Sequence, residues 1–405
     1  MRVSHPTTTA ATGSTASGAL TVALCFAVAV LEGFDIQAIG IAAPRLAPEL
    51  GFEPDQLGVI FSISNIGIVI GASFGGWLAD RIGRKPVFMG AVAMFGLFTL
   101  ATALAGNFEL LFAVRLLVGL GFGAALPNMM AVASEISRPE RRTITAAAMF
   151  CGLPFGGGMS AWLTQLLPPG TDWRVLFYIG GLLPLVIVPA LYLWMQETLM
   201  RRGDGRAGRA PIVEALFAEG RRAPTLLLWL AFLPTLLILY LILNWLPTLV
   251  AGQGLDPAAA PRASLAFNWG SIPGALLFSA LVDRLGARWP LVASYAALVG
   301  SLAMLSGASE LASMVLFSAA AGFFLMGANY SLYGVAAAYY PRIVRGTGSG
   351  ASVAVGRIGS VIGPLLAGAL LAQGLTATQV IFVMVPAAVI AGVSVFVLSF
   401  YPQAE

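Results

Sequence analysis

Long apolar runs separated by short polar loops fill this chain of 405 residues. An apolar run of about 20 residues forms a helix long enough to cross the hydrocarbon core of a bilayer. We therefore predict an all-α integral membrane protein with about twelve transmembrane helices. The runs that we assign to these helices are 20–44, 57–79, 87–105, 110–133, 143–167, 173–195, 225–250, 263–282, 291–306, 311–339, 346–372 and 380–400.

Polar segments divide the predicted helices into two bundles of six. The predicted parts are a disordered cytoplasmic tail at 1–18, a bundle at 19–195, a cytoplasmic linker at 196–223, a bundle at 224–400 and a cytoplasmic tail at 401–405. Within the linker, residues 211–219 have the pattern of a short interfacial amphipathic helix. The sequence DRIG at 80–83 recurs as DRLG at 283–286, which predicts two pseudo-symmetric halves in the same orientation.

Composition and charge fit this membrane assignment. The chain is 58% hydrophobic and 10% charged, with a mean hydropathy of +0.88, which excludes a soluble domain. Its basic residues gather in the even-numbered loops, whereas the odd-numbered loops hold only Arg45, Arg174 and Arg262. The positive-inside rule then places both termini in the cytoplasm. The net charge of +4 is scattered without interleaved aromatic residues, so we expect no nucleic-acid partner.

Few residues suit metal or covalent chemistry. The single histidine, His5, lies in the predicted tail, and Cys25 and Cys151 fall within apolar runs, where packing rather than a disulfide is expected. We find no metal-ligand cluster and no nucleophile paired with a base. The sequence therefore predicts that the protein is not an enzyme and binds neither a metal nor a cofactor.

Two carboxylates interrupt the first predicted helix near its middle. Glu32 and Asp35 are three residues apart, so they project from nearly the same helix face. An ionised acid at that depth costs about 2.5–3.5 kcal/mol or more unless it is paired, protonated or hydrated. One interpretation is a proton or ligand site lining a central cavity. The alternative is a structural pair with basic residues of neighbouring helices.

Two arginines also lie within predicted helices. Arg115 is in the fourth, and Arg357 is near the middle of the eleventh, in the opposite half from the acids. A guanidinium binds a carboxylate through two parallel hydrogen bonds, so Arg357 is our candidate for the substrate-binding cation. For both arginines, the alternative is a structural salt bridge. Several further polar and aromatic residues could contact a substrate through ring stacking or hydrogen bonds, and the alternative for each is packing. They are Asn128, Asn244, Asn268, Asn329, Trp245, Trp269, Tyr330 and Tyr333.

One loop carries a family motif. Residues 76–85, GWLADRIGRK, resemble the cytoplasmic loop motif of the major facilitator superfamily. The alternative is a generic positive turn of the cytoplasmic side. Ala287 stands in the second copy where the first has Arg84, so the gate is expected to be asymmetric. The resemblance implies a gate that holds one conformation shut, formed by Gly76, Asp80, Arg81, Gly83, Arg84 and, from the next cytoplasmic loop, Arg142.

Further motifs refine the resemblance. The segment from Arg115 to Gly123 resembles the fourth-helix motif that the superfamily associates with proton coupling, and Gly119 and Gly123 allow another helix to pack closely. Residues 152–158 resemble only loosely the antiporter motif of drug exporters. The run LEGFD at 31–35, followed by Ala43-Pro44, is similar to the aromatic acid:proton symporter family, which more often has aspartate where Glu32 stands.

Within that family, residues 31–38, 123–128, 151–154 and, more weakly, 357–364 resemble bacterial transporters of 3-(3-hydroxyphenyl)propionate. The resemblance implies a transporter of the bacterial inner membrane that imports an aromatic carboxylate with protons by alternating access. We expect it to act as a monomer within the lipid bilayer. The alternatives are a superfamily antiporter that exports amphipathic drugs and a transporter-like membrane sensor.

The intramembrane charges suggest how protons couple to transport. In the empty state, Arg357 or Arg115 is expected to pair with Asp35 or Glu32. A substrate carboxylate would compete for the arginine, and the released acid would take up a proton. One proton for each monoanion would make transport electroneutral. Because two acids are present, we favour two protons, with Asp35, Glu32 and Arg115 as the coupling residues.

Overall fold

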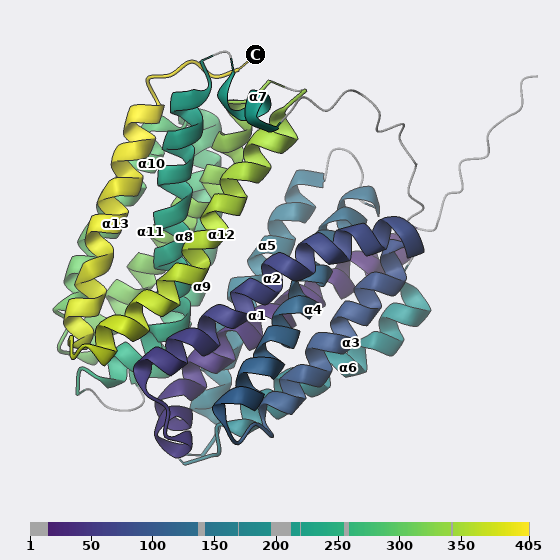
Figure 1. Cartoon of the computed structure of the whole chain (residues 1–405), viewed down its shortest axis with the longest axis vertical. Helices are drawn as coiled ribbons and strands as arrows, with labels where there is room; N and C mark the ends of the chain where they lie inside the picture. Colours follow the sequence, from purple (N-terminus) through teal and green to yellow (C-terminus); the bar gives the residue numbers. More distant parts are fainter. Residues whose placement is uncertain are drawn as a thin grey trace, which may run out of the picture.

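The computed structural model describes residues 15–136, 142–168, 170–195, 212–218, 220–254, 259–341 and 343–404. Over these residues the chain forms thirteen α-helices and no strand (Figure 1). The helices are α1 (Thr15–Leu50), α2 (Pro54–Ile82), α3 (Arg84–Thr102), α4 (Phe108–Ile136), α5 (Arg142–Leu166), α6 (Arg174–Trp194), α7 (Ile212–Phe217), α8 (Arg222–Ala251), α9 (Ala259–Leu285), α10 (Arg288–Ser306), α11 (Leu311–Ala338), α12 (Arg345–Ala372) and α13 (Ala377–Leu398).

The described helices confirm the all-α membrane fold. Eleven of them are long and apolar enough to cross a membrane, namely all except α5 and the six-residue α7. The helix α5 has 25 residues, and the side chains at its start (142–147) lie outside the described part of the chain. It packs against α1 of its own half and α9 of the other, so neighbouring helices cover much of it. The described residues thus form twelve long helices.

Helix boundaries differ from the prediction at several ends. We expected the first helix to end at Pro44, but α1 continues through Pro44 and Pro48 to Leu50. Proline is tolerated inside membrane helices because neighbouring groups satisfy the carbonyl that it leaves free. The short helix α7 lies within the segment predicted to be an interfacial helix. Residues 1–14 of the predicted tail and 196–211 of the predicted linker lie outside the described residues.

The helices form two bundles, α1–α6 and α8–α13, which lie side by side (Figure 1). The repeated DRIG and DRLG sequences occupy equivalent turns, and Gly83 and Gly286 have φ angles of 98° and 78°. Glycine adopts positive φ without the strain that a Cβ would cause. Because spanning helices alternate in direction, both turns lie at the same end as α7. We call this the linker end, and the opposite end, with the turns at Gly51 and Gly374, the far end.

Close helix packing depends on glycine in both halves. A Cβ atom on Gly119 or Gly123 of α4 would collide with the backbone of Ser64 or Ile68 in α2. In the second half, Gly322 of α11 faces the α9 backbone in the same way. Small residues let membrane helices approach closely enough for extensive van der Waals contact, which drives their association in lipid. The predicted packing role of Gly119 and Gly123 is confirmed.

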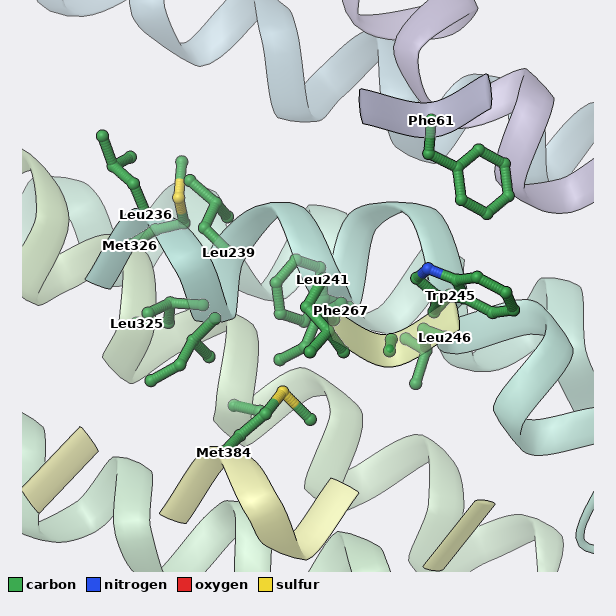
Figure 2. Close-up of a cluster of buried hydrophobic side chains, with 14 of the residues drawn as sticks. Phe61, Leu236, Leu239, Leu241, Trp245, Leu246, Phe267, Leu325, Met326 and Met384 are labelled. Atoms are coloured by element: carbon green, nitrogen blue, oxygen red, sulfur yellow. The ribbon is translucent and has the colours of Figure 1, made fainter. Parts of the chain in front are cut away.

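The buried core continues from one half to the other. Trp245 of α8 meets Phe61 of α2, with ring centroids 5.2 Å apart and ring planes at 87°. Edge-to-face aromatic pairs of this kind add about 0.5–1.5 kcal/mol to the effect of burial. Figure 2 shows Phe61 and Trp245 together with buried side chains of α8, α9, α11 and α13, which are Leu236, Leu239, Leu241, Leu246, Phe267, Leu325, Met326 and Met384.

Hydrogen bonds also join the halves, and uncharged groups make them. Ser62 Oγ of α2 donates to the Val361 carbonyl of α12 at 2.7 Å. Asn65 Nδ2 donates to the Ser360 carbonyl, also of α12, at 3.1 Å. These bonds lie in the part of α2 nearer the far end, and the ribbons of the two halves diverge toward the linker end (Figure 1). The halves are therefore held together mainly at the far end and at mid-depth.

Ion pairs are distributed differently from these hydrogen bonds. Each ion pair whose two partners are both described lies within the first half. The deepest joins Arg115 of α4 to Asp35 of α1 at 2.9 Å. At the far end, Arg174 pairs with Glu49 at 2.7 Å and with Asp172 at 3.3 Å. Among the residues that the structure describes, no salt bridge connects one half to the other.

Candidate functional site

A cavity lies between the two halves at mid-depth. It contains about 740 Å³ of empty space, part of it open to solvent. Aromatic and aliphatic side chains form most of its wall, with a few amides and one arginine, a composition typical of sites for small organic ligands. The lining residues are Gly33, Ile36, Gln37, Leu126, Phe150, Leu153, Pro154, Leu236, Leu239, Tyr240, Leu243, Phe267, Asn268, Ser271, Met326, Asn329, Tyr330, Tyr333 and Arg357.

An ion pair is buried beside this cavity. Arg115 Nη1 donates to Asp35 Oδ2 at 2.9 Å, and the two side chains are 1% and 0% exposed. Thr99 Oγ1 donates to the other carboxylate oxygen at 2.8 Å, and Arg115 Nε donates to Ser64 Oγ at 3.2 Å. Gly119, one turn after Arg115, brings α4 against α2 and so places the guanidinium within reach of both partners.

Glu32 lies one helical turn before Asp35 and has a different environment. Its side chain is 3% exposed, and Oε2 has no hydrogen-bond partner among the described residues. The charge of Arg357 attracts an ionised Glu32 and that of Asp35 repels it, but Glu32 forms no ion pair with Arg357 within 4.0 Å. A buried carboxylate without a partner is costly, and proton binding removes that cost.

Arg357 is the cation of the cavity wall. It comes from α12, and its Nη1 donates to the Tyr240 hydroxyl of α8 at 2.8 Å. A guanidinium has five N–H donors, and this is the one hydrogen bond that the Arg357 guanidinium makes among the described residues. Its remaining donors are therefore available to a ligand in the cavity.

Aromatic rings from both halves complete the wall. Phe150 of α5 lies 5.6 Å from Tyr330 and 6.4 Å from Tyr333 of α11, measured between ring centroids, and its plane is 24° from that of Tyr333. The Tyr330 hydroxyl donates to the Phe150 carbonyl at 2.9 Å. This arrangement offers flat apolar surfaces to an aromatic ligand, close to the guanidinium.

Comparison with known proteins now places the chain in a family. Residues 25–266 and 254–405 match the profile of the Major Facilitator Superfamily. The chain belongs to the major facilitator superfamily. This confirms the resemblance drawn from residues 76–85 and 115–123, and it makes the chain a membrane transport protein and not an enzyme.

Among curated relatives of this major facilitator transporter, the 3-(3-hydroxy-phenyl)propionate transporter of Escherichia coli (strain K12) is 41% identical over 379 residues, covering 94% of this chain and 93% of the relative. The gallate transporter of Pseudomonas putida is 34% identical, with 88% and 86% covered. The 4-hydroxybenzoate transporter PcaK of Pseudomonas aeruginosa is 33% identical, with 95% and 93% covered. All three relatives are named for aromatic acids, in agreement with the family resemblance.

Solved structures support the fold of this transporter. A crystal structure of the nucleoside transporter NupG superposes with a TM-score of 0.74 at 16% identity, covering 95% of this chain and 100% of that chain. A bacterial homologue of the human lysosomal transporter Spinster gives 0.75 at 17% identity, with 96% and 98% covered. At such identities, the likeness concerns the helical architecture alone.

The transporter brings some predicted substrate contacts together and separates others. Arg357, Asn329 and Tyr330 all line the cavity. Trp245 does not line it, since it is 0% exposed and its Nε1 donates to the Pro364 carbonyl at 3.0 Å. Asn128 is not among the lining residues either, and its Nδ2 donates to the Ala124 carbonyl one turn earlier at 2.8 Å.

The alternatives for the two arginines are also separated. Arg115 has the predicted salt bridge, with Asp35 as its partner. Arg357 pairs directly with neither Asp35 nor Glu32 in this conformation; it contacts Tyr240 instead. In this conformation, the pair is between Arg115 and Asp35, and Arg357 lines the cavity.

The gate residues lie at the linker end of the transporter. Asp80 is exposed and has no hydrogen bond or ion pair with any described residue, and the Arg81 guanidinium lies 3.9 Å from the centroid of the Trp77 ring. Gly76 has open space around its Cβ position. The side chain of Arg142 lies outside the described part of the chain. The gating role of this loop stays a prediction.

Several site residues carried little signal in the sequence. Ser64 and Thr99 are polar positions within apolar runs, which marks them as unusual but does not reveal that they hydrogen bond to Arg115 and Asp35. Tyr240 stands among leucines and isoleucines, and no pattern distinguishes it. Tyr240 reaches Arg357 because α12 packs beside α8, and the sequence does not show that packing.

Proposed function

We propose that this transporter imports an aromatic carboxylate together with protons by alternating access. The single observation that carries the proposal is Arg357 facing an aromatic-lined cavity with four of its five N–H donors unused by described protein groups. A cation in this position selects anions. It disfavours the amphipathic cations of a drug exporter, which was the alternative.

The proposed substrate is 3-(3-hydroxyphenyl)propionate or a related phenylpropanoid acid. The relative with 41% identity is named for that compound, and two further relatives are named for gallate and 4-hydroxybenzoate. In the proposed complex, the carboxylate accepts two hydrogen bonds from Arg357. The ring lies against Phe150 and Tyr330, whose centroids are 5.6 Å apart.

Proton coupling in this proposal starts from the different environments of Asp35 and Glu32. Asp35 has a cation partner and a hydroxyl partner, whereas Glu32 depends on the more distant Arg357. When a substrate carboxylate binds Arg357, the guanidinium stabilises an ionised Glu32 less. Glu32 then takes up a proton, so substrate and proton favour each other's binding, and this coupling is reciprocal.

The second proton is assigned to Asp35. Movement of α4 relative to α1 would separate Arg115 from Asp35, and the exposed carboxylate would be protonated before the cavity closes around it. One proton for each monoanion would be driven by the pH gradient alone, at about 1.4 kcal/mol for each pH unit. Two protons would also move net charge and add about 2.3 kcal/mol for each 100 mV.

The proposal includes a location and an orientation. The loops rich in lysine and arginine would face the cytoplasm, which places both termini and α7 on that side of the bacterial inner membrane. Import by a functional monomer would then alternate the cavity between the two sides through movement of the two bundles. The neutral contacts between α2 and α12 at the far end would open when the cavity faces outward.

Uptake into proteoliposomes tests the proposed function. Purified protein is reconstituted, and entry of labelled 3-(3-hydroxyphenyl)propionate is followed while the pH gradient and the membrane potential are clamped separately. We expect accumulation driven by an acidic exterior and increased by a negative interior. Uptake that ignores the pH gradient would refute proton coupling, and uptake that ignores potential would refute the two-proton version alone. An amide analogue of the substrate serves as the uncharged control.

A further inference from the structure

One amide in the cavity wall has no hydrogen-bond partner among the described residues. Asn329 of α11 lines the cavity and is 3% exposed. Its Oδ1 is buried and bonds to no described group. A buried acceptor without a donor costs about 1–3 kcal/mol, and a protein interior rarely leaves one unpaired. The position therefore needs an explanation beyond the fold.

The other asparagines show what the fold normally does with this side chain. The chain has six asparagines, and five of them make at least one side-chain hydrogen bond within the described residues. Asn329 makes none there. The five bonded residues are Asn65, Asn107, Asn128, Asn244 and Asn268. Asn329 is thus the asparagine whose amide has no partner within the described part of the chain.

The position of Asn329 relative to the cation is informative. Tyr333 lies four residues later on the same face of α11 and interacts electrostatically with Arg357. Four residues of helix correspond to a rise of about 6 Å. Phe150 covers Tyr330 and Tyr333 from the opposite half. Along α11, Tyr333, which interacts with the cation, and Asn329 are thus about one helical turn apart, and both line the cavity.

We infer that Asn329 binds a hydroxyl group on the aromatic ring of the substrate and thereby selects hydroxylated aryl carboxylates over unsubstituted ones. This inference rests on the proposed function, because Arg357 must hold the carboxylate at the other end of the ligand. A phenol both donates and accepts a hydrogen bond, as does the carboxamide of asparagine. A site that leaves a polar group unpaired discriminates strongly against a ligand that lacks the matching hydroxyl.

The test measures binding of two acids that differ by one hydroxyl. Purified full-length transporter is titrated with 3-(3-hydroxyphenyl)propionate and with 3-phenylpropionate. We expect the wild type to bind the hydroxylated acid about tenfold more tightly or better. In Asn329→Leu and Asn329→Ala, this ratio falls to about one, whereas the affinity for 3-phenylpropionate stays close to that of the wild type. Asn107→Ala removes an exposed amide outside the cavity and keeps the wild-type ratio.

Each result decides between a ligand contact and a structural role. In each Asn329 variant, an unchanged affinity for 3-phenylpropionate shows that the cavity is intact. Because two variants are made, the test still works if one of them fails to fold. A wild-type ratio in both variants, or an equal loss of both acids in both variants, overturns the inference. Equal binding of the two acids by the wild type overturns it too, but leaves the proposed function standing. If the wild type binds neither acid, the proposed function fails, and the inference fails with it.

Discussion

Replacing Asp35 with asparagine removes one charge from the buried pair and little else. The two side chains have nearly the same shape, and an amide oxygen can still accept the hydrogen bond from Thr99 Oγ1, which is 2.8 Å long in the wild type. Arg115 loses its counter-charge and keeps Ser64 as a hydrogen-bond partner. If Asp35 carries a transported proton, Asp35→Asn is fixed in a state that resembles the protonated acid.

The effect on stability follows from the geometry of the pair. At the observed 2.9 Å and an effective dielectric constant of about 20, two unit charges attract by about 6 kcal/mol. Desolvation offsets much of this attraction, but removing one partner of a buried pair typically costs about 3–5 kcal/mol, because the other charge stays buried. We expect a loss of that size in the free energy of unfolding. Thr99→Val, which keeps the ion pair, should cost about 1.5–3 kcal/mol.

The transport assay separates coupling from binding. A pH gradient of two units supplies about 2.7 kcal/mol for each proton, enough for the wild type to concentrate a monoanion about a hundredfold with one proton. Asp35→Asn keeps Glu32 as a proton site, so it should concentrate substrate only as far as one proton allows and should not respond to membrane potential. It should still exchange internal for external substrate, because exchange needs no net proton movement. Thr99→Val retains the carboxylate and should respond to potential as the wild type does.

The outcomes differ clearly. Uptake by Asp35→Asn that still increased with a negative interior would refute the assignment of a transported proton to Asp35. If Thr99→Val also lost its response to potential while keeping exchange, the local geometry of the pair rather than its charge would be responsible. Loss of exchange in Asp35→Asn with full exchange in Thr99→Val would instead give the ion pair a role in the conformational change itself.

Further substitutions test the remaining roles. Glu32→Gln should keep uptake driven by the pH gradient but remove its dependence on potential. The exposed Glu109→Gln is the control and should change neither. A response of Glu32→Gln to potential would contradict the role of Glu32 as a proton site. The wild type should bind the acid more tightly than its amide by about 1.5–3 kcal/mol, and Arg357→Ala should erase this preference. If binding titrations of Arg357→Ala still show the preference, the anion site lies elsewhere. Asp80→Asn and Arg84→Ala should slow uptake more than they weaken substrate binding. They should also alter the labelling of cysteines engineered at the linker end. Normal uptake together with normal labelling would contradict the gating role of these residues.

The spanning helices were predictable because bilayer thickness fixes their length and composition. The glycines at 119 and 123 were predictable for a similar reason, since a four-residue spacing puts both on one helix face. Boundaries were less certain, as the continuation of α1 through Pro44 shows. In water that proline would more often end the helix, whereas in a bundle neighbouring groups compensate for it.

The site was harder to predict because membrane helices are apolar on all sides. In a soluble helix, the polar face marks the solvent, but α8 carries leucine or isoleucine around its whole circumference. The sequence therefore does not indicate that Tyr240 faces the cavity and Trp245 faces the neighbouring helices. Charges at mid-depth were evident, but which acid pairs with which arginine depends on the approach of α4 to α1, and that is a property of the packed bundle.

The absence of a salt bridge between the halves, among the described residues, has a consequence for how the protein moves. Separation of α2 from α12 breaks hydrogen bonds between neutral groups, each worth about 0.5–1.5 kcal/mol net, and leaves no charge to be resolvated. Ionic strength screens interactions between charges and hardly affects such bonds. We therefore expect the contact between α2 and α12 to hold equally well in dilute buffer and in strong salt.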